Sequence, residues 1–268
     1  MQRWLHIVTA AAVSGLFLVA GCQMGQVHSA LRTDPAPLSG FLPNHRLLAR
    51  QPDSFPFHYF YLKKNLPVYE NIHIAPVNIQ HLRESNGWAR FDRLLSGRLE
   101  GDIEELSRFM RRAYIQAFQK ADVRPKLRVV NRRDLPRTLV LETALVGLVP
   151  SKAELNALGL AGSFIIPGIG LVTSFMSSGS ITVECRIRDG RTGQVLAMYA
   201  NTETDPKALL SISGYTWLTT ARINIKTMAA HTARVLAARD YRTVERDFPL
   251  RFVSLIQEGE LDKKSRKR

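Results

Sequence analysis

Cys22 is the side chain whose surroundings point most directly to chemistry. It follows Leu18-Val19-Ala20-Gly21, and the apolar run from Trp4 to Ala20 contains no charged residue. A positive start, an apolar core and small residues before a cut are typical of a secretory signal. A thiol directly after the cut can receive a diacylglycerol and palmitate, so the motif indicates a lipobox. We predict that residues 1–21 are a lipoprotein signal peptide and that Cys22 carries the lipid.

A signal anchor that remains in the membrane is the alternative interpretation of the same run. About 17 apolar residues are at the low end of what a span requires. The small residues before Cys22 would then have no purpose, so we favour processing and lipidation.

Other residues with chemical potential are scattered along the chain. His73 and His81 are eight positions apart, and the first acidic residue after His73 is Glu84, beyond both histidines. Two histidines with no acid between them are a poor ligand set for a metal. Glu142 is the one acid in an apolar strand, and we expect a salt bridge for it rather than catalysis. The spacings of zinc proteases, serine hydrolases and phosphate-binding loops are absent. We therefore predict no catalytic, cofactor-binding or metal-binding residue and no enzyme activity.

The positive charge of the chain bears on its partners. Without Arg3, residues 22–268 keep 36 basic and 23 acidic side chains, which gives a formal charge of +13. Such a balance favours an anionic neighbour, such as anionic lipid or a polyanion, although a solvated basic surface is the simpler alternative. Nucleic acid is a poor partner for an exported protein. Cys185 has no second cysteine once Cys22 is lipidated, so the domain must fold without a disulfide.

Two amphipathic helices are predicted. Residues 97–120 place an apolar stripe on one face and charges on the other, with Glu104 and Arg108 spaced for an i,i+4 ion pair. Residues 216–239 form the second helix. Its apolar stripe is made by Trp217, Leu218, Ala221, Ile225, Met228, Ala229, Thr232, Val235 and Leu236.

Five strands are predicted, at 71–80, 126–130, 139–149, 180–188 and 194–200. The first contains Pro76, which marks a bulge or an edge. The third is apolar on both faces, which suits a central strand. The fourth alternates between apolar and polar residues. The last two flank Asp189-Gly190-Arg191-Thr192-Gly193, a turn cluster that closes a β-hairpin. Cys185 lies on the apolar face of this hairpin, and we expect it to be a small buried hydrophobe.

Residues 39–69 are rich in proline and in aromatic residues. We expect an extended segment that wraps over the domain and is held by its aromatic side chains, because no helical period survives so many prolines. An aromatic platform for carbohydrate is the alternative.

The stretch 155–179 is an apolar, glycine-rich insertion without charged residues. Pro167 and the glycines argue against an uninterrupted helix. Three interpretations remain open: a loop folded onto the domain, a segment that contacts membrane or a partner, and a true span. Its candidate contact residues are Phe164, Ile165, Ile166, Pro167, Ile169, Leu171 and Phe175.

Two motifs resemble those of a Gram-negative bacterial lipoprotein family known only as a domain of unknown function. They are Ser39-Gly40-Phe41-Leu42, soon after the lipidated cysteine, and Asp189-x-x-Thr192-Gly193-x-x-Leu196-Ala197 across the hairpin. The resemblance covers nearly all of the mature chain and brings no known activity. In lipoproteins of enteric bacteria, Asp after the lipidated cysteine retains the protein in the inner membrane. Gln23 stands there in this chain, so the resemblance implies sorting to the outer membrane.

These observations predict a signal peptide, a flexible tether at 22–38, one α+β domain at 39–261 and a basic disordered tail at 262–268. The domain should hold a mixed, mainly antiparallel sheet of about five strands, with two amphipathic helices on one face. We expect an outer-membrane lipoprotein whose non-enzymatic domain faces the periplasm and binds a protein or envelope component. A lipid- or polyanion-binding module and a cryptic hydrolase are the alternatives.

Overall fold

The structure is a computed structural model that describes residues 38–84, 99–120, 127–149, 180–204, 217–238 and 240–247. All of these residues fall within one compact unit, Asp34–Pro249. In chain order, its elements are η1 (His45–Leu47), β1 (Ala49–Arg50), β2 (Tyr59–Leu62), β3 (Asn71–Ile74), α2 (Gln80–Arg83), α4 (Leu99–Gln119), β4 (Arg128–Val130), β5 (Thr138–Val149), β6 (Ser180–Asp189), β7 (Val195–Thr204), α6 (Trp217–Ala237) and η4 (Tyr241–Thr243).

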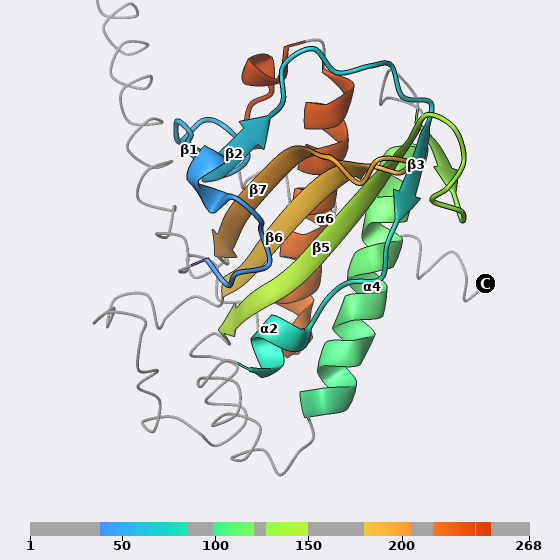
Figure 1. The fold of residues 1–268 in the computed structure, drawn as a ribbon. Coiled ribbons are helices and arrows are strands. Elements are labelled where there is room, and N and C mark those ends of the chain that lie inside the picture. Colours follow the sequence, from blue (N-terminus) through green and yellow to red (C-terminus); the bar gives the residue numbers. More distant parts are fainter. Residues whose placement is uncertain are drawn as a thin grey trace, which may run out of the picture. The chain divides into compact units, whose positions relative to one another are not determined.

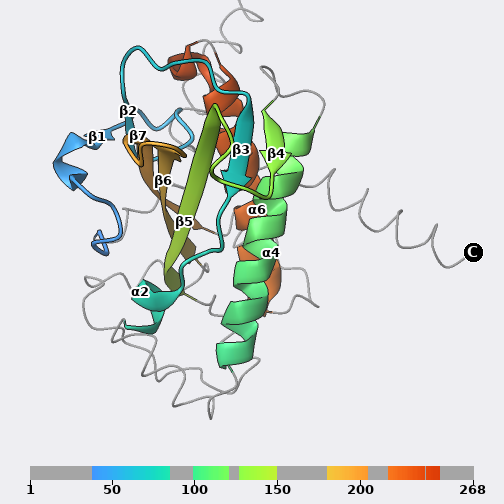
Figure 2. The same ribbon diagram turned by 45° about the vertical axis from the view of Figure 1, so that its right-hand side comes forward.

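The strands form one mixed sheet in the order β1-β2-β7-β6-β5-β3-β4. The pairs β1–β2, β2–β7, β7–β6 and β6–β5 are antiparallel, whereas β5–β3 and β3–β4 are parallel. Both long helices, α4 and α6, lie side by side on one face of the sheet (Figures 1 and 2). The α+β class, the mixed sheet and the shared helix face are therefore as predicted.

The predicted number of about five strands and two helices is wrong, because the described residues hold seven strands and three α-helices. The two extra strands, β1 and β2, lie in the proline-rich aromatic segment, where the prolines fall outside both strands. Tyr59 and Tyr61 lie on one face of β2 while Phe60 and Leu62 lie on the other, the alternation that a strand imposes. The extra helix, α2, has only four residues, which is too short to show a period.

The strand predicted at 71–80 ends early. β3 stops at Ile74, and Pro76 has no N–H to donate to a neighbouring strand. Pairing with β5 resumes once after the proline, where the Asn78 N–H donates to the Thr143 carbonyl at 2.8 Å. α2 then begins at Gln80.

The main core lies between the sheet and the two long helices. The predicted stripe of α4 is buried, from Ile103 to Phe118. Phe55, Phe57 and Phe60 join the same core at exposures of 4%, 0% and 3%, and the Phe57 ring stacks on Tyr199 with centroids 4.0 Å apart. Because these rings are buried, they do not form the alternative carbohydrate platform.

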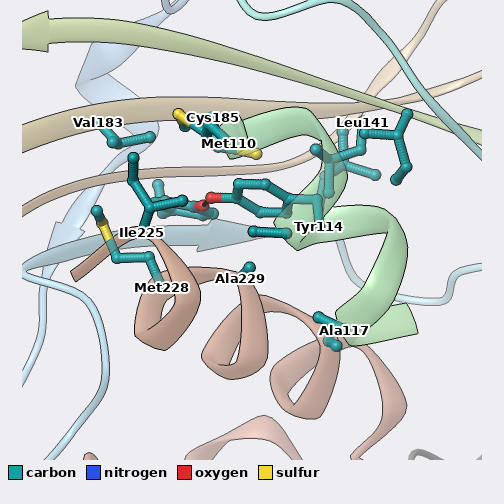
Figure 3. Close-up of a cluster of buried hydrophobic side chains, with 14 of the residues drawn as sticks. Met110, Tyr114, Ala117, Leu141, Val183, Cys185, Ile225, Met228 and Ala229 are labelled. Atoms are coloured by element: carbon teal, nitrogen blue, oxygen red, sulfur yellow. Dashed lines mark hydrogen bonds between the residues drawn. The ribbon is translucent and has the colours of Figure 1, made fainter. Parts of the chain in front are cut away.

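A chain of hydroxyl groups crosses this core. The hydroxyls of Tyr114 and Tyr199 are 2.5 Å apart, Tyr199 lies 3.0 Å from Thr232 Oγ1, and Thr232 donates to the Met228 carbonyl at 2.8 Å. Figure 3 shows the Tyr114 ring between the sheet and α6, close to Cys185. Burial raises the pKa of both tyrosines and of the Cys185 thiol, so all three groups stay protonated. Cys185 is thus a small buried core residue, as predicted.

A charged contact holds the segment after α6. Asp247 accepts two hydrogen bonds from Arg234, at 3.1 and 2.8 Å, and its carboxylate lies 3.4 Å from Nε2 of the buried His231. These contacts lower the pKa of Asp247 to about 2. The carboxylate therefore stays charged at neutral pH and keeps the chain attached to the helix.

Candidate functional site

The face of the sheet that turns away from the helices carries the conspicuous cluster of charged side chains. Alternation along β6 sends Ile181, Val183, Cys185 and Ile187 into the core, so Glu184, Arg186 and Arg188 lie on the opposite, outer face. Glu142 of β5 is the register partner of Arg186 and lies on the same face. We call these four side chains the outer-face cluster.

Glu184 fixes the start of the described chain. The Ser39 N–H and hydroxyl donate to its two carboxylate oxygens at 2.7 and 2.9 Å. Gly40 follows with φ of 91°, a left-handed conformation that turns the backbone and that glycine adopts without strain. Because Glu184 is only 1% exposed, these two hydrogen bonds replace the water that its carboxylate oxygens would otherwise bind.

Arg186 joins the outer-face cluster to Phe41. Its Nε donates to Glu142 Oε2 at 2.5 Å and its Nη1 donates to the Phe41 carbonyl at 3.0 Å. The guanidinium carbon also lies 4.4 Å from the centre of the Phe41 ring, a cation–π distance. Arg188 pairs with the other carboxylate oxygen of Glu142. Glu142 therefore forms salt bridges with two arginines, which confirms the salt bridge predicted for it.

An apolar patch completes this face. Phe41 and Leu42 are 8% and 3% exposed, and they pack with Ala144, Met198 and Ala200. Tyr59 and Tyr61 pack against the same patch from β2. The segment Ser39–Leu42 is thus bound to the sheet by both polar and apolar contacts.

The β6–β7 turn closes a β-hairpin, as predicted. Asp189 Oδ1 accepts from the backbone N–H groups of Arg191 and Thr192 at 2.9 and 2.7 Å, and these bonds lower the pKa of the carboxyl. Tyr69 donates to the other oxygen, Oδ2, at 2.7 Å. Gly193 has φ of 71° and donates its N–H to the Asp189 carbonyl at 2.9 Å.

Gly193→Val is expected to lower the free energy of unfolding by about 1–2 kcal/mol, because a β-branched residue is strained at positive φ. An added Cβ meets no atom within 4 Å, so the loss measures the backbone conformation alone. Thermal melts of Gly193→Val and Gly193→Asn test this, and asparagine should retain most of the stability. Equal melts for wild type and the valine variant would contradict the prediction.

The chain matches the family model "Protein of unknown function (DUF3313)" over residues 37–231. It belongs to this family. The matched range contains both motifs, Ser39–Leu42 and the Asp189 turn, together with the outer-face cluster that they adjoin. No curated protein matches the chain.

Among solved structures, the chain is similar to two bacterial proteins at low identity. The PelC dodecamer from Paraburkholderia phytofirmans is 12% identical with a TM-score of 0.34, over 68% of this chain and 96% of that one. The hypothetical protein CT253 from Chlamydia trachomatis is 13% identical with a TM-score of 0.36, over 66% of this chain and 99% of that one. Likenesses of this size carry no functional argument.

The two histidines considered for a metal in this DUF3313 protein have different neighbours. His73 Nδ1 lies 3.2 Å from the Val130 carbonyl of β4, whereas the His81 ring packs edge-on against Phe41 with centroids 6.1 Å apart. Within the described ranges, no group of three metal-binding side chains occurs, and no helix combines the length and apolar composition of a membrane span.

Several predicted sites lie outside the described residues. These are the lipidation site Cys22, the tether as far as residue 37, the tail at 262–268 and the contact residues Phe164, Ile165, Ile166, Pro167, Ile169, Leu171 and Phe175. Sequence reasoning missed the pairing of Ser39 with Glu184 and the contacts of Arg186 with Phe41. A signal was present, because Glu184, Arg186 and Arg188 recur with the period of a strand and lie opposite its apolar face.

Proposed function

We propose that this DUF3313 protein is an outer-membrane lipoprotein, anchored through Cys22, whose domain faces the periplasm and binds a protein or another envelope component. The observation that carries the proposal is the motif Leu18-Val19-Ala20-Gly21-Cys22 at the end of a charge-free apolar run. Gln23 supports sorting to the outer membrane.

The docked segment Ser39–Leu42 gives this anchor a defined point of attachment. Ser39 follows Cys22 by 17 positions, and a fully extended chain of this length spans at most about 60 Å. The hydrogen bonds to Glu184 therefore keep the outer face of the sheet within this distance of the lipid.

The contact segment is proposed to be 158–176. It belongs to the connection between β5 and β6, whose last and first residues, Val149 and Ser180, are register partners. The two ends of the connection are therefore held together by the sheet itself, and closing the hairpin does not require the length of the insertion. Closure of the hairpin therefore does not account for the apolar insertion, and we propose that the insertion contacts a partner.

Cys22→Ala is expected to abolish acylation of the protein. Labelling cells with a palmitate analogue measures this, and fractionation should show that the variant leaves the outer-membrane pool. Cys185→Ala is the matched control, because its thiol is buried and its label should equal that of wild type. Undiminished label in the Cys22 variant would exclude the proposed anchor.

A further inference from the structure

One end of the sheet gathers three loops that are far apart in sequence. They are 63–70 between β2 and β3, 131–137 between β4 and β5, and the turn 189–194 between β6 and β7. Tyr69 donates to Asp189 at 2.7 Å, Lys63 donates to Gln194 at 2.6 Å, and the Glu70 N–H donates to the Arg137 carbonyl at 3.0 Å. These bonds make the three loops one surface, at the upper end of the sheet in Figure 1.

This loop surface is basic. It carries six basic side chains, Lys63, Lys64, Arg132, Arg133, Arg137 and Arg191, against three acids, Glu70, Asp134 and Asp189, so the difference is +3.

All three acids are already engaged within the surface. Glu70 pairs with Arg137, Asp134 pairs with Arg132, and Asp189 binds the amides of its own turn. Within the described part of the chain, none of these acids forms a salt bridge with Lys64, Arg133 or Arg191, which are exposed. The surface therefore presents three cations to an outside anion.

Apolar side chains project from the same surface. Val68 is 73% exposed and Leu66 is 36% exposed. Both follow Lys63-Lys64-Asn65, where Asn65 turns the backbone at φ of 56°. Aliphatic side chains beside lysine and arginine suit the interface of an anionic bilayer, where the apolar groups enter the headgroup region and the cations bind phosphates. A soluble polyanion would use the charges but not the aliphatic groups.

We propose that the loop surface rests on an anionic phospholipid bilayer, with Leu66 and Val68 in the headgroup region and Lys64, Arg133 and Arg191 on lipid phosphates. The inference rests on the proposed lipid anchor, because an anchored domain meets the membrane at a high effective concentration. A patch too weak to hold a free protein on a vesicle can therefore orient a tethered one.

The anchor can reach this orientation. Ser39 is bound at Glu184, five residues before Asp189 on the same strand, which corresponds to about 17 Å along β6. The tether, at most about 60 Å long, covers this distance.

Ser180, at the other end of β6, lies about 30 Å from the loop surface. The insertion that begins beside it therefore starts on the side away from this membrane, where a periplasmic partner is accessible.

The test uses the full-length lipidated protein in vesicles. Val68→Cys is labelled with an environment-sensitive fluorophore; Cys22 carries the lipid and Cys185 is buried, so the new thiol is the reactive one. The emission of the label should shift to shorter wavelength in vesicles that contain phosphatidylglycerol, relative to vesicles of phosphatidylcholine alone. The shift should be lost when Lys64→Glu and Arg191→Glu are added.

Leu47→Cys is the matched control, because Leu47 is 50% exposed and lies in η1, outside the loop surface. Its label should give the same emission in both vesicles. Equal emission from the Val68 label in both vesicles, or an equal shift at Leu47, would overturn the inference. A third result would also overturn the inference. In it, the protein binds soluble polyphosphate, the charge reversals abolish this binding, and the emission of the Val68 label does not shift with either vesicle. Flotation of the protein with the vesicles distinguishes failure of the proposed lipid anchor from failure of this inference. Without the anchor, the protein would float with neither vesicle.

Discussion

A chain in which residues 158–176 are replaced by a short Gly/Ser linker is expected to fold and to lose its partner. β5 and β6 are paired from Leu139↔Asp189 to Val149↔Ser180, so the hairpin is held by contacts outside the replaced stretch. Loop-closure entropy grows slowly with length, and a shorter connection costs little. Circular dichroism and a thermal melt, starting the chain at Gln23, measure folding. Crosslinking pull-downs from membranes and liposome binding measure association.

A variant with the natural number of residues distinguishes the effect of losing apolar side chains from the effect of shortening the connection. Ile165→Ser with Ile166→Ser should weaken crosslinking as the replacement does, while the melt remains that of wild type. Loss of cooperative unfolding in the replaced chain would show that the stretch belongs to the core. Retained folding with unchanged association would make it a passive loop.

Arg186→Ala is expected to lower the free energy of unfolding by about 2–4 kcal/mol. Glu142 and Arg186 have side-chain exposures of only 17% and 26%. Removal of Arg186 leaves this poorly solvated carboxylate with Arg188 alone. The variant also loses the hydrogen bond to the Phe41 carbonyl and the cation–π contact with its ring. Denaturant unfolding measures the loss through the midpoint, at an unchanged m-value.

Arg132→Ala is the matched control for this ion pair. Arg132 bonds Asp134 at 2.6 Å, yet their side chains are 70% and 62% exposed, and such surface pairs contribute little. Its unfolding midpoint should equal that of wild type. Arg186→Lys should recover part of the stability, because lysine keeps the charge but cannot form the planar fork. A midpoint for Arg186→Ala equal to that of the control would mean that the outer-face cluster does not stabilise the fold.

The elements whose apolar residues recur regularly over many positions could be predicted from the sequence. The helices predicted at 97–120 and 216–239 are α4 and α6, because more than five turns of apolar spacing fix each buried face. β5 and β6 also have the predicted faces, and β7 covers the strand predicted at 194–200. β1, β2 and α2 have two to four residues each, and so short a pattern does not distinguish an edge strand from an extended segment.

The candidate site could be predicted only in part. The salt bridge of Glu142 followed from one acid in an apolar strand, since a buried charge needs a partner. The pairing of Ser39 with Glu184 did not follow, because the two residues are 145 positions apart and no local pattern joins them. The face of each strand is thus encoded locally, whereas the segment that covers a face is decided by the tertiary fold.

The placement of β2 beside β7 governs the time at which the sheet can be completed. Tyr59 and Ala200 are register partners, so the N-terminal aromatic segment has no strand to join until the β6–β7 hairpin exists. Pairings between such distant residues raise the contact order and slow folding, because a long loop must close before the contact stabilises it. Until then, Phe57 has no Tyr199 to stack on, so its ring stays exposed until the late pairing of β2 with β7 buries it.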